Sequence, residues 1–162
     1  MVVMSIRAQN LPVIEEKIKY MGRKGRAPRP AMLQISGKMV LAVDQRFQSQ
    51  GRRGGGSWRK LSEDWLFAKL ARGLDPRILF ATGELHRSLV RINHPNNKLR
   101  ITGTSIEYGS TLPYANTQMF GDPARNIPAR PYIRFTAADR REWANILLRY
   151  VTSHWSKGTR AK

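Results

Sequence analysis

The chain has 162 residues, with 29 Lys and Arg against 11 Asp and Glu, so its formal net charge is +18. This length suits a single domain with a substantial core, and a hydrophobic content of 41% argues against global disorder. The absence of cysteine excludes disulfides and thiolate metal sites and favours a reducing compartment. The apolar start MVVM lacks the long apolar segment of a signal peptide, and no apolar run is long enough to span a membrane.

The positive charge is unevenly distributed along the chain. From Lys17 to Lys60 there are twelve basic residues and one acid, whereas from Leu61 to Lys162 there are sixteen basic residues and eight acids. Such a surface attracts polyanions, which include nucleic acid, an anionic membrane and an acidic protein. The plainer interpretation is solubility with nonspecific affinity for polyanions, but the asymmetry favours a specific acidic or nucleic-acid partner.

The first predicted elements are two helices joined by a basic segment. Apolar residues near helical spacing predict a short amphipathic helix over residues 11–21. The segment GRKGRAPRP, residues 22–30, is a linker or loop, either solvated or a basic arm that becomes ordered on a partner. A broad apolar face then predicts a longer helix over residues 31–48, used for core packing or subunit contact.

A glycine-rich basic loop over residues 48–60 follows. It contains four glycines but lacks both the GxxxxGK[ST] and the GxGxxG pattern, so nucleotide binding is disfavoured. Trp58 is expected to anchor this loop to the fold. Ser62, with acids directly after it, predicts the start of a helix over residues 63–72, and Gly73 predicts its end.

The second half of the chain shows the two-residue period of strands. Alternation over residues 89–92 and 98–101, separated by the turn NHPNN, predicts a hairpin, and a third strand around residues 106–108 makes it a meander. Residues 111–120 are expected to form a short helix or a turn. Tyr132, Ile133 and Phe135 indicate a further strand near residues 131–135.

The final helix is the clearest prediction. Thr136 and Asp139 form a variant of the capping box, and the apolar residues from Trp143 to Val151 follow at i, i+3, i+4, i+7 and i+8. This pattern predicts a helix over residues 137–153 and a frayed basic end over residues 157–162.

Together these elements predict an α+β fold. A small antiparallel sheet, made of the meander plus the strand near 131–135, would pack against the long helix and the C-terminal helix. Residues 1–156 would form one domain with basic loops at 22–30 and 48–60, followed by a flexible basic tail.

The sequence offers little for catalysis. The three histidines, His86, His94 and His154, show no HExxH motif and no paired metal-ligand spacing. No GxSxG elbow accompanies the serines, and the acids are too scattered for a two-carboxylate or two-metal mechanism. We therefore expect neither an enzyme nor a bound metal or cofactor.

The segment IPARPYIRF, residues 127–135, has a different character. Pro128 and Pro131 restrict the backbone on either side of Ala129 and Arg130, which fixes the direction of one arginine. Arg130 could therefore make a reproducible bidentate bond to a carboxylate of its own or a neighbouring subunit. The alternative is that Arg130 only braces its own fold.

The order of these motifs resembles the phage virion morphogenesis family, the tail-completion proteins of the phage Mu G type. Members look like L-x-x-T-G-x-L-x-x-S, then Y-A-x-x-H-Q-x-G, then I-P-A-R-P. The resemblance covers about residues 40–152. One departure is Thr117, which stands where the family has His and puts any role of that His in doubt. The matching positions here are Leu79, Thr82, Gly83, Leu85 and Ser88; Tyr114, Ala115, Gln118 and Gly121; and Ile127 to Pro131.

The resemblance implies a structural role at the junction of phage tail and head. Such proteins complete the tail or neck as rings around the DNA path, so a ring, expected to be a hexamer, would dock on the tail end and allow head joining. Expected partners are tail tube or terminator proteins, head-connector proteins and the genomic DNA, with no membrane. The expected location is the tail–neck region of the virion, and the host cytoplasm during assembly.

Two sets of candidate residues follow from this comparison. The family-motif and subunit-interface candidates are Trp58, Thr82, Gly83, Leu85, Tyr114, Gln118, Gly121, Pro128, Arg130 and Pro131. The candidates that would face DNA or an acidic partner are Arg23, Lys24, Arg26, Arg29, Arg52, Arg53, Arg59 and Lys60. The main alternative is a nonspecific nucleic-acid-binding module that uses the same basic segments, and a nuclease is a weaker third option.

Overall fold

The computed structural model describes residues 2–7 and 28–158, with side chains described for residues 28–150. The predicted helix over residues 11–21, the basic residues Arg23, Lys24 and Arg26, and most of the predicted tail lie outside the described residues.

The described chain forms a three-stranded antiparallel sheet covered by helices. The strands are β1 (Val2–Arg7), β2 (Asn97–Ile101) and β3 (Ser105–Ser110), in the order β1-β3-β2. In the central strand, Ile106 stands opposite Ile6 on one side and Ile101 on the other. The predicted α+β class is confirmed.

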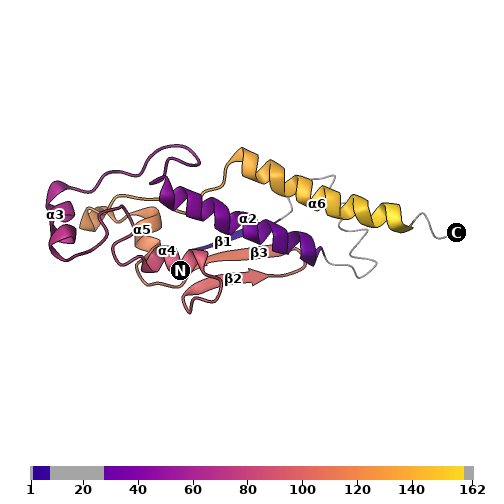
Figure 1. The fold of residues 1–162 in the computed structure, drawn as a ribbon, viewed down its shortest axis with the longest axis horizontal. Coiled ribbons are helices and arrows are strands. Elements are labelled where there is room, and N and C mark those ends of the chain that lie inside the picture. The colour runs from indigo at the N-terminus through magenta and orange to yellow at the C-terminus, as the bar shows by residue number, and fades with distance from the viewer. Residues whose placement is uncertain (1, 8–27, 159–162) are drawn as a thin grey trace.

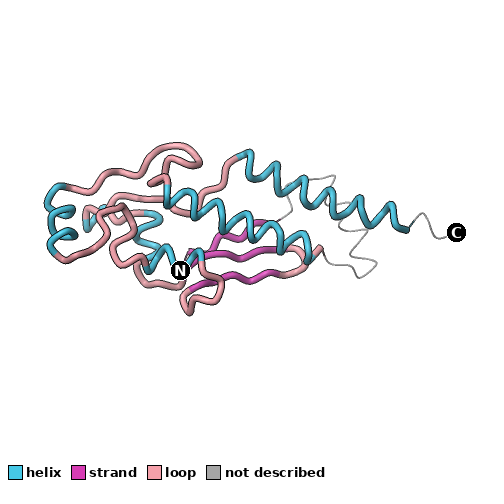
Figure 2. Tube along the Cα trace, in the orientation of Figure 1, coloured by secondary structure: helices cyan, strands magenta, loops and turns pink. Residues whose placement is uncertain are grey.

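Two long helices run along this sheet. Helix α2 (Arg29–Gln48) packs against β2 and β3, and α6 (Ala137–Gly158) packs alongside α2 (Figure 1). The shorter helices are α3 (Glu63–Ala71), α4 (Glu84–Val90) and α5 (Ala115–Phe120), with a 3-10 turn, η2 (Pro123–Arg125). Long loops connect them around the end of the sheet where α3 lies (Figure 2).

Helix α2 supplies one side of the core. The predicted helix over 31–48 is confirmed, although it begins at Arg29 inside the predicted basic loop, because proline is tolerated in the first turn. Ile35, Met39, Val43 and Phe47 recur at helical spacing and are fully buried. Each such side chain contributes about 1.5–3 kcal/mol on burial.

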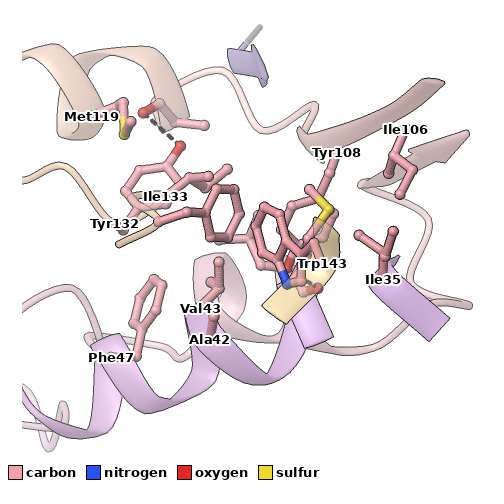
Figure 3. Close-up of a cluster of buried hydrophobic side chains, with 14 of the residues drawn as sticks. Ile35, Ala42, Val43, Phe47, Ile106, Tyr108, Met119, Tyr132, Ile133 and Trp143 are labelled. Atoms are coloured by element: carbon pink, nitrogen blue, oxygen red, sulfur yellow. Dashed lines mark hydrogen bonds between the residues drawn. The ribbon is translucent and has the colours of Figure 1, made fainter. Parts of the chain in front are cut away.

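The opposite side of the core comes from the sheet and from the segment after Arg130. Tyr108, Tyr132 and Ile133 are fully buried, and Figure 3 shows them meeting the α2 residues and Trp143 of α6. The Tyr132 hydroxyl donates to the Ala115 carbonyl at 3.0 Å, which is the dashed bond toward α5 in Figure 3. A buried hydroxyl needs such a partner, so this bond also fixes α5 on the core.

One predicted strand of the meander is wrong, while the predicted turn over residues 93–97 is present but joins a helix to β2. The residues around Leu89 belong to α4, where Leu85, Ser88 and Leu89 are buried at helical spacing. Four alternating residues are too few to separate the two periods. The strands β2 and β3 are confirmed, but β3 is the central strand because its other edge pairs with β1, which the sequence did not predict.

The predicted strand near residues 131–135 is also wrong. Its aromatic residues are buried as expected, but the segment belongs to no sheet. Pro131 has no N–H to donate to a ladder, and its carbonyl accepts from the Arg46 and Trp58 side chains instead. Hydrogen bonds from these two side chains take the place of those that a neighbouring strand would make.

The C-terminal helix begins with the predicted capping box. Thr136 Oγ1 accepts from the Asp139 N–H at 3.0 Å, and Asp139 Oδ2 accepts from the Thr136 N–H at 2.7 Å. Arg53 of the glycine-rich loop joins them through an ion pair of 2.6 Å with Asp139. Burial alone would raise the pKa of Asp139, but the hydrogen bonds from Arg53 and Thr136 outweigh it and hold this pKa below its ordinary value.

We predict that Asp139→Asn lowers the free energy of unfolding by about 2–3 kcal/mol at neutral pH, because it removes a partly buried ion pair and weakens the cap. A depressed carboxyl pKa stabilises the fold above about pH 4 and loses that effect as pH falls through the lower folded pKa. Urea unfolding across pH should therefore show the two proteins converging below about pH 4. A difference that stays constant into that range would contradict the assignment.

Candidate functional site

Residues from three separated sequence motifs line one cavity of about 810 Å³. We call it the motif cavity. Its walls are the segment from Arg59 through α3, the segment before and into α4, and α5 with the loop that leads to Arg130. The sequence-predicted candidates among its lining residues are Arg59, Lys60, Thr82, Gly83, Leu85, Tyr114, Gln118, Pro128 and Arg130.

The first motif forms the turn that starts α4. Gly83 is the N-cap with a φ of 75°, a conformation that glycine adopts without strain. Leu79 adopts a positive φ of 63° although it carries a side chain, so this wall holds some backbone strain. Thr82 Oγ1 accepts from the Glu84 N–H, and Leu85 points into the core.

The second motif shapes the wall made by α5. Tyr114 is exposed on the cavity, and the Gln118 carbonyl accepts from the Arg130 N–H at 2.9 Å. Gly121, with a φ of 80°, lies so close to the next segment that an added Cβ would be 2.7 Å from the Ala129 nitrogen. Thr117 Oγ1 accepts from Arg125 at 3.2 Å. Counted along Y-A-x-x-H-Q-x-G from Tyr114, the His position of the pattern falls on Gln118, so the departure assigned to Thr117 was placed one residue too early.

The third motif places Arg130 inside the fold. Only 7% of this residue is exposed, and its Nε and Nη2 both donate to the Arg59 carbonyl, at 3.4 and 3.3 Å. Burial lowers the pKa of Arg130, and the positive charge of Arg59 adds to this. In the described part of the chain, Arg130 therefore braces its own fold and faces the cavity without a carboxylate partner.

Pro131 and Trp58 lie just behind the cavity wall. The Pro131 carbonyl accepts from Arg46 Nε at 2.6 Å and from Trp58 Nε1 at 3.4 Å. Trp58 is buried edge-on against Phe47, as expected for a residue that anchors the loop. These two candidates support the wall rather than line it.

The remaining basic candidates divide into two groups. Arg52, Arg59 and Lys60 are exposed, and Arg29 is exposed at the start of α2, where it donates to the Ile101 carbonyl. Arg53 is held by Asp139 and Gln45. Arg23, Lys24 and Arg26 lie outside the described residues.

In α3 a charged residue is buried while the apolar residues are exposed, which the sequence did not predict. Lys69 is the one buried residue of this helix, with 4% exposed, and Nζ donates to the Arg77 carbonyl at 2.7 Å. In contrast, Trp65, Phe67 and Leu70 are 52%, 69% and 52% exposed. The predicted bounds and the Ser62 cap are confirmed to within one residue, but nothing in the local pattern indicates which face is buried.

Within the described chain, no cluster of His, Asp and Glu could hold a metal ion. His86 pairs with Asp44 at 2.7 Å and His94 with Glu84 at 3.0 Å. None of the helices that the structure describes has the length and apolar character needed to cross a membrane.

Comparison with known proteins extends the motif resemblance to most of the chain. Residues 10–152 match the phage virion morphogenesis family, well over half of the sequence. The chain belongs to this family. The family assigns it to phage virion assembly as a virion-associated, structural protein.

One curated relative is similar over a large part of its length. It is the uncharacterized protein MJ0331 of Methanocaldococcus jannaschii, which is 27% identical over 101 residues. The match covers 62% of this chain and 72% of the relative. No solved structure matches.

The close approach of Gly121 to the segment before Arg130 can be tested by substitution. We predict that Gly121→Ala lowers the free energy of unfolding by about 2 kcal/mol or more, because φ is positive and the nearest atoms are backbone. Gly37→Ala is the control, since Gly37 is exposed within α2 with nothing within 4 Å of an added Cβ. That change should stabilise the protein by about 0.5–1 kcal/mol in the same urea titration. Equal effects of both changes would contradict the close approach.

Proposed function

We propose that this protein is a structural subunit of the phage tail–head junction. Its copies assemble as a ring, expected to be a hexamer, that docks on the tail end and allows the head to join. Tail completion, tail termination and a neck position all fit this role. The ring would contact tail tube or terminator proteins, head-connector proteins and the DNA that passes through it, in the tail–neck region of the virion after assembly in the host cytoplasm.

The observation that carries this proposal is the exposed apolar face of α3. Leu66, Phe67 and Leu70 fall within about half of the helix circumference and all are exposed, as is Trp65 on the cavity side. Soluble monomers rarely leave contiguous aromatic and aliphatic side chains in water, and such patches mark protein interfaces. This face supports burial of α3 against another subunit or a tail protein.

The position of α3 fits a ring contact. It lies at one end of the elongated molecule, and α6 extends toward the other end (Figure 1). A head-to-tail contact joins two different surfaces of identical subunits and closes into a ring when the rotation allows it. A projecting helix at one end is suited to such a contact.

The charge supports a position near DNA. Arg52, Arg59 and Lys60 are exposed, and the chain carries +18. Contacts between basic side chains and phosphates carry no sequence information, which suits DNA that must still move through a ring. The same charge favours a second candidate function, a nonspecific nucleic-acid-binding module, whose binding would fall steeply with salt and depend on the basic loops.

We predict that the double variant Phe67→Ser with Leu70→Ser abolishes self-association while the fold remains, because both side chains are exposed in the single chain. Mass photometry and circular dichroism measure the two properties. Ile92→Ser, at a position that is 62% exposed outside α3, should leave the oligomer intact. A wild-type protein that stays monomeric, or a double variant that still assembles, would argue against α3 as the subunit contact.

A second prediction addresses the role in the virion. A stop codon at Trp58 in the parent phage should yield DNA-filled heads beside unjoined tails in negative-stain electron micrographs of the lysate. Over-long tails would shift the role to tail termination. Normal joined virions would overturn the assembly role and make nucleic-acid binding the leading function.

A further inference from the structure

The motif cavity contains buried positive charge that its own chain does not neutralise. Lys69 and Arg130 are more than nine-tenths buried, and both line the cavity. Their printed hydrogen bonds go to backbone carbonyls, those of Arg77 and Arg59. Arg130 Nη1 makes no hydrogen bond within the described residues, and it is not sealed from solvent. Buried cations are ordinarily paired with an anion.

The surroundings increase this excess of charge. Arg59 and Lys60 also line the cavity, and the one carboxylate in its lining, Glu84, is already bound by Arg87 at 2.9 Å and His94 at 3.0 Å. Burial lowers the pKa of Lys69, and Arg130 lowers it further against the opposing effect of Asp75. The charged forms of Lys69 and Arg130 are therefore destabilised until an anion binds beside them.

The rest of the chain has few carboxylates to offer. Asp75, Glu84, Asp122, Asp139 and Glu142 form ion pairs with Lys or Arg of the same chain, and Asp44 contacts His86. With a net charge of +18, a second copy would on average be repelled from a cationic cavity. The counter-charge is thus best supplied by a different, acidic molecule.

We propose that the motif cavity binds an acidic segment of a partner protein, with one carboxylate placed against Arg130 and Lys69. A planar guanidinium with an unused Nη1 matches a carboxylate, and Lys69 adds a point charge. The lining also contains the apolar side chains of Trp65, Leu79 and Ile127, among a few uncharged polar residues. An occupant that carries both carboxylates and aliphatic side chains therefore fits better than a nucleic-acid backbone.

This inference rests on the proposed function only in that the partner would be a neighbouring virion protein. The site itself can be tested on the isolated full-length protein, without a ring or a phage. The two can therefore fail independently: peptide binding by a protein that never forms rings would retain the site and reject the ring.

The experiment measures binding of a labelled twelve-residue peptide of Glu pairs alternating with Leu, by fluorescence anisotropy, beside a matched peptide with Gln in place of Glu. Lys60→Glu reverses an exposed charge at the cavity, and Arg141→Glu reverses one on the exposed side of α6. The Glu peptide should bind, the Gln peptide should not, and Lys60→Glu should weaken binding about five- to tenfold while Arg141→Glu has little effect. Arg130→Gln, checked for folding, should weaken it at least as much.

Hydrogen–deuterium exchange with the Glu peptide should show protection confined to the lining segments, residues 59–74, 79–85, 114–118 and 126–130. Equal binding of both peptides, or equal loss in both charge-reversal variants, would overturn the proposal in favour of general surface attraction. Displacement of the peptide by inorganic phosphate or by a short DNA duplex, with protection of the same segments, would overturn it in favour of a phosphate site.

Discussion

The structure depends on one buried contact, the hydrogen bond from Arg46 to the Pro131 carbonyl. Arg46 is fully buried in α2, and its Nε donates to Pro131 at 2.6 Å while Nη1 donates to the Arg53 carbonyl. Burial lowers the pKa of Arg46, and the nearby charges of Arg134 and Arg53 add to this. The guanidinium thus joins the long helix, the glycine-rich loop and the segment after the cavity. Removing it would take this donor from the Arg53 carbonyl and leave the Pro131 carbonyl with Trp58 alone.

The glycine-rich loop follows from this contact. A Cβ on Gly54 would lie 2.9 Å from Arg46 Nη1, and a Cβ on Gly51 would lie 2.7 Å from the Trp58 ring. Both glycines have positive φ, so the backbone turns tightly around two large side chains. Gly51 and Gly54 are therefore accounted for by an arginine and a tryptophan of the same fold, which the loop encloses. The same wrapping brings Arg53 to Asp139 and connects the loop to the start of α6.

The sequence was most informative where structure is local. The α2 stripe, the Ser62 cap and the Thr136–Asp139 box predict their helices to within a few residues, because these signals lie within one or two turns. It was least informative where pairing is distant: β1 was missed because its partner is β3, and residues 131–135 were misassigned because their partners are side chains from α2 and the loop. The motif residues were found by their order, but only the fold shows that most of them line one cavity. Lys69 carried no local signal, since its burial is decided by which way α3 faces.

The position of β1 has a consequence for the order of events during synthesis. This strand is the first element of the chain, yet it pairs with residues about a hundred positions later, so the sheet cannot close until β3 has left the ribosome. Closing so long a loop is entropically unfavourable until the intervening helices have packed. The nascent chain therefore carries an unpaired strand for most of its translation, and the sheet forms late. β1 has no partner strand until about two thirds of the chain has been synthesised.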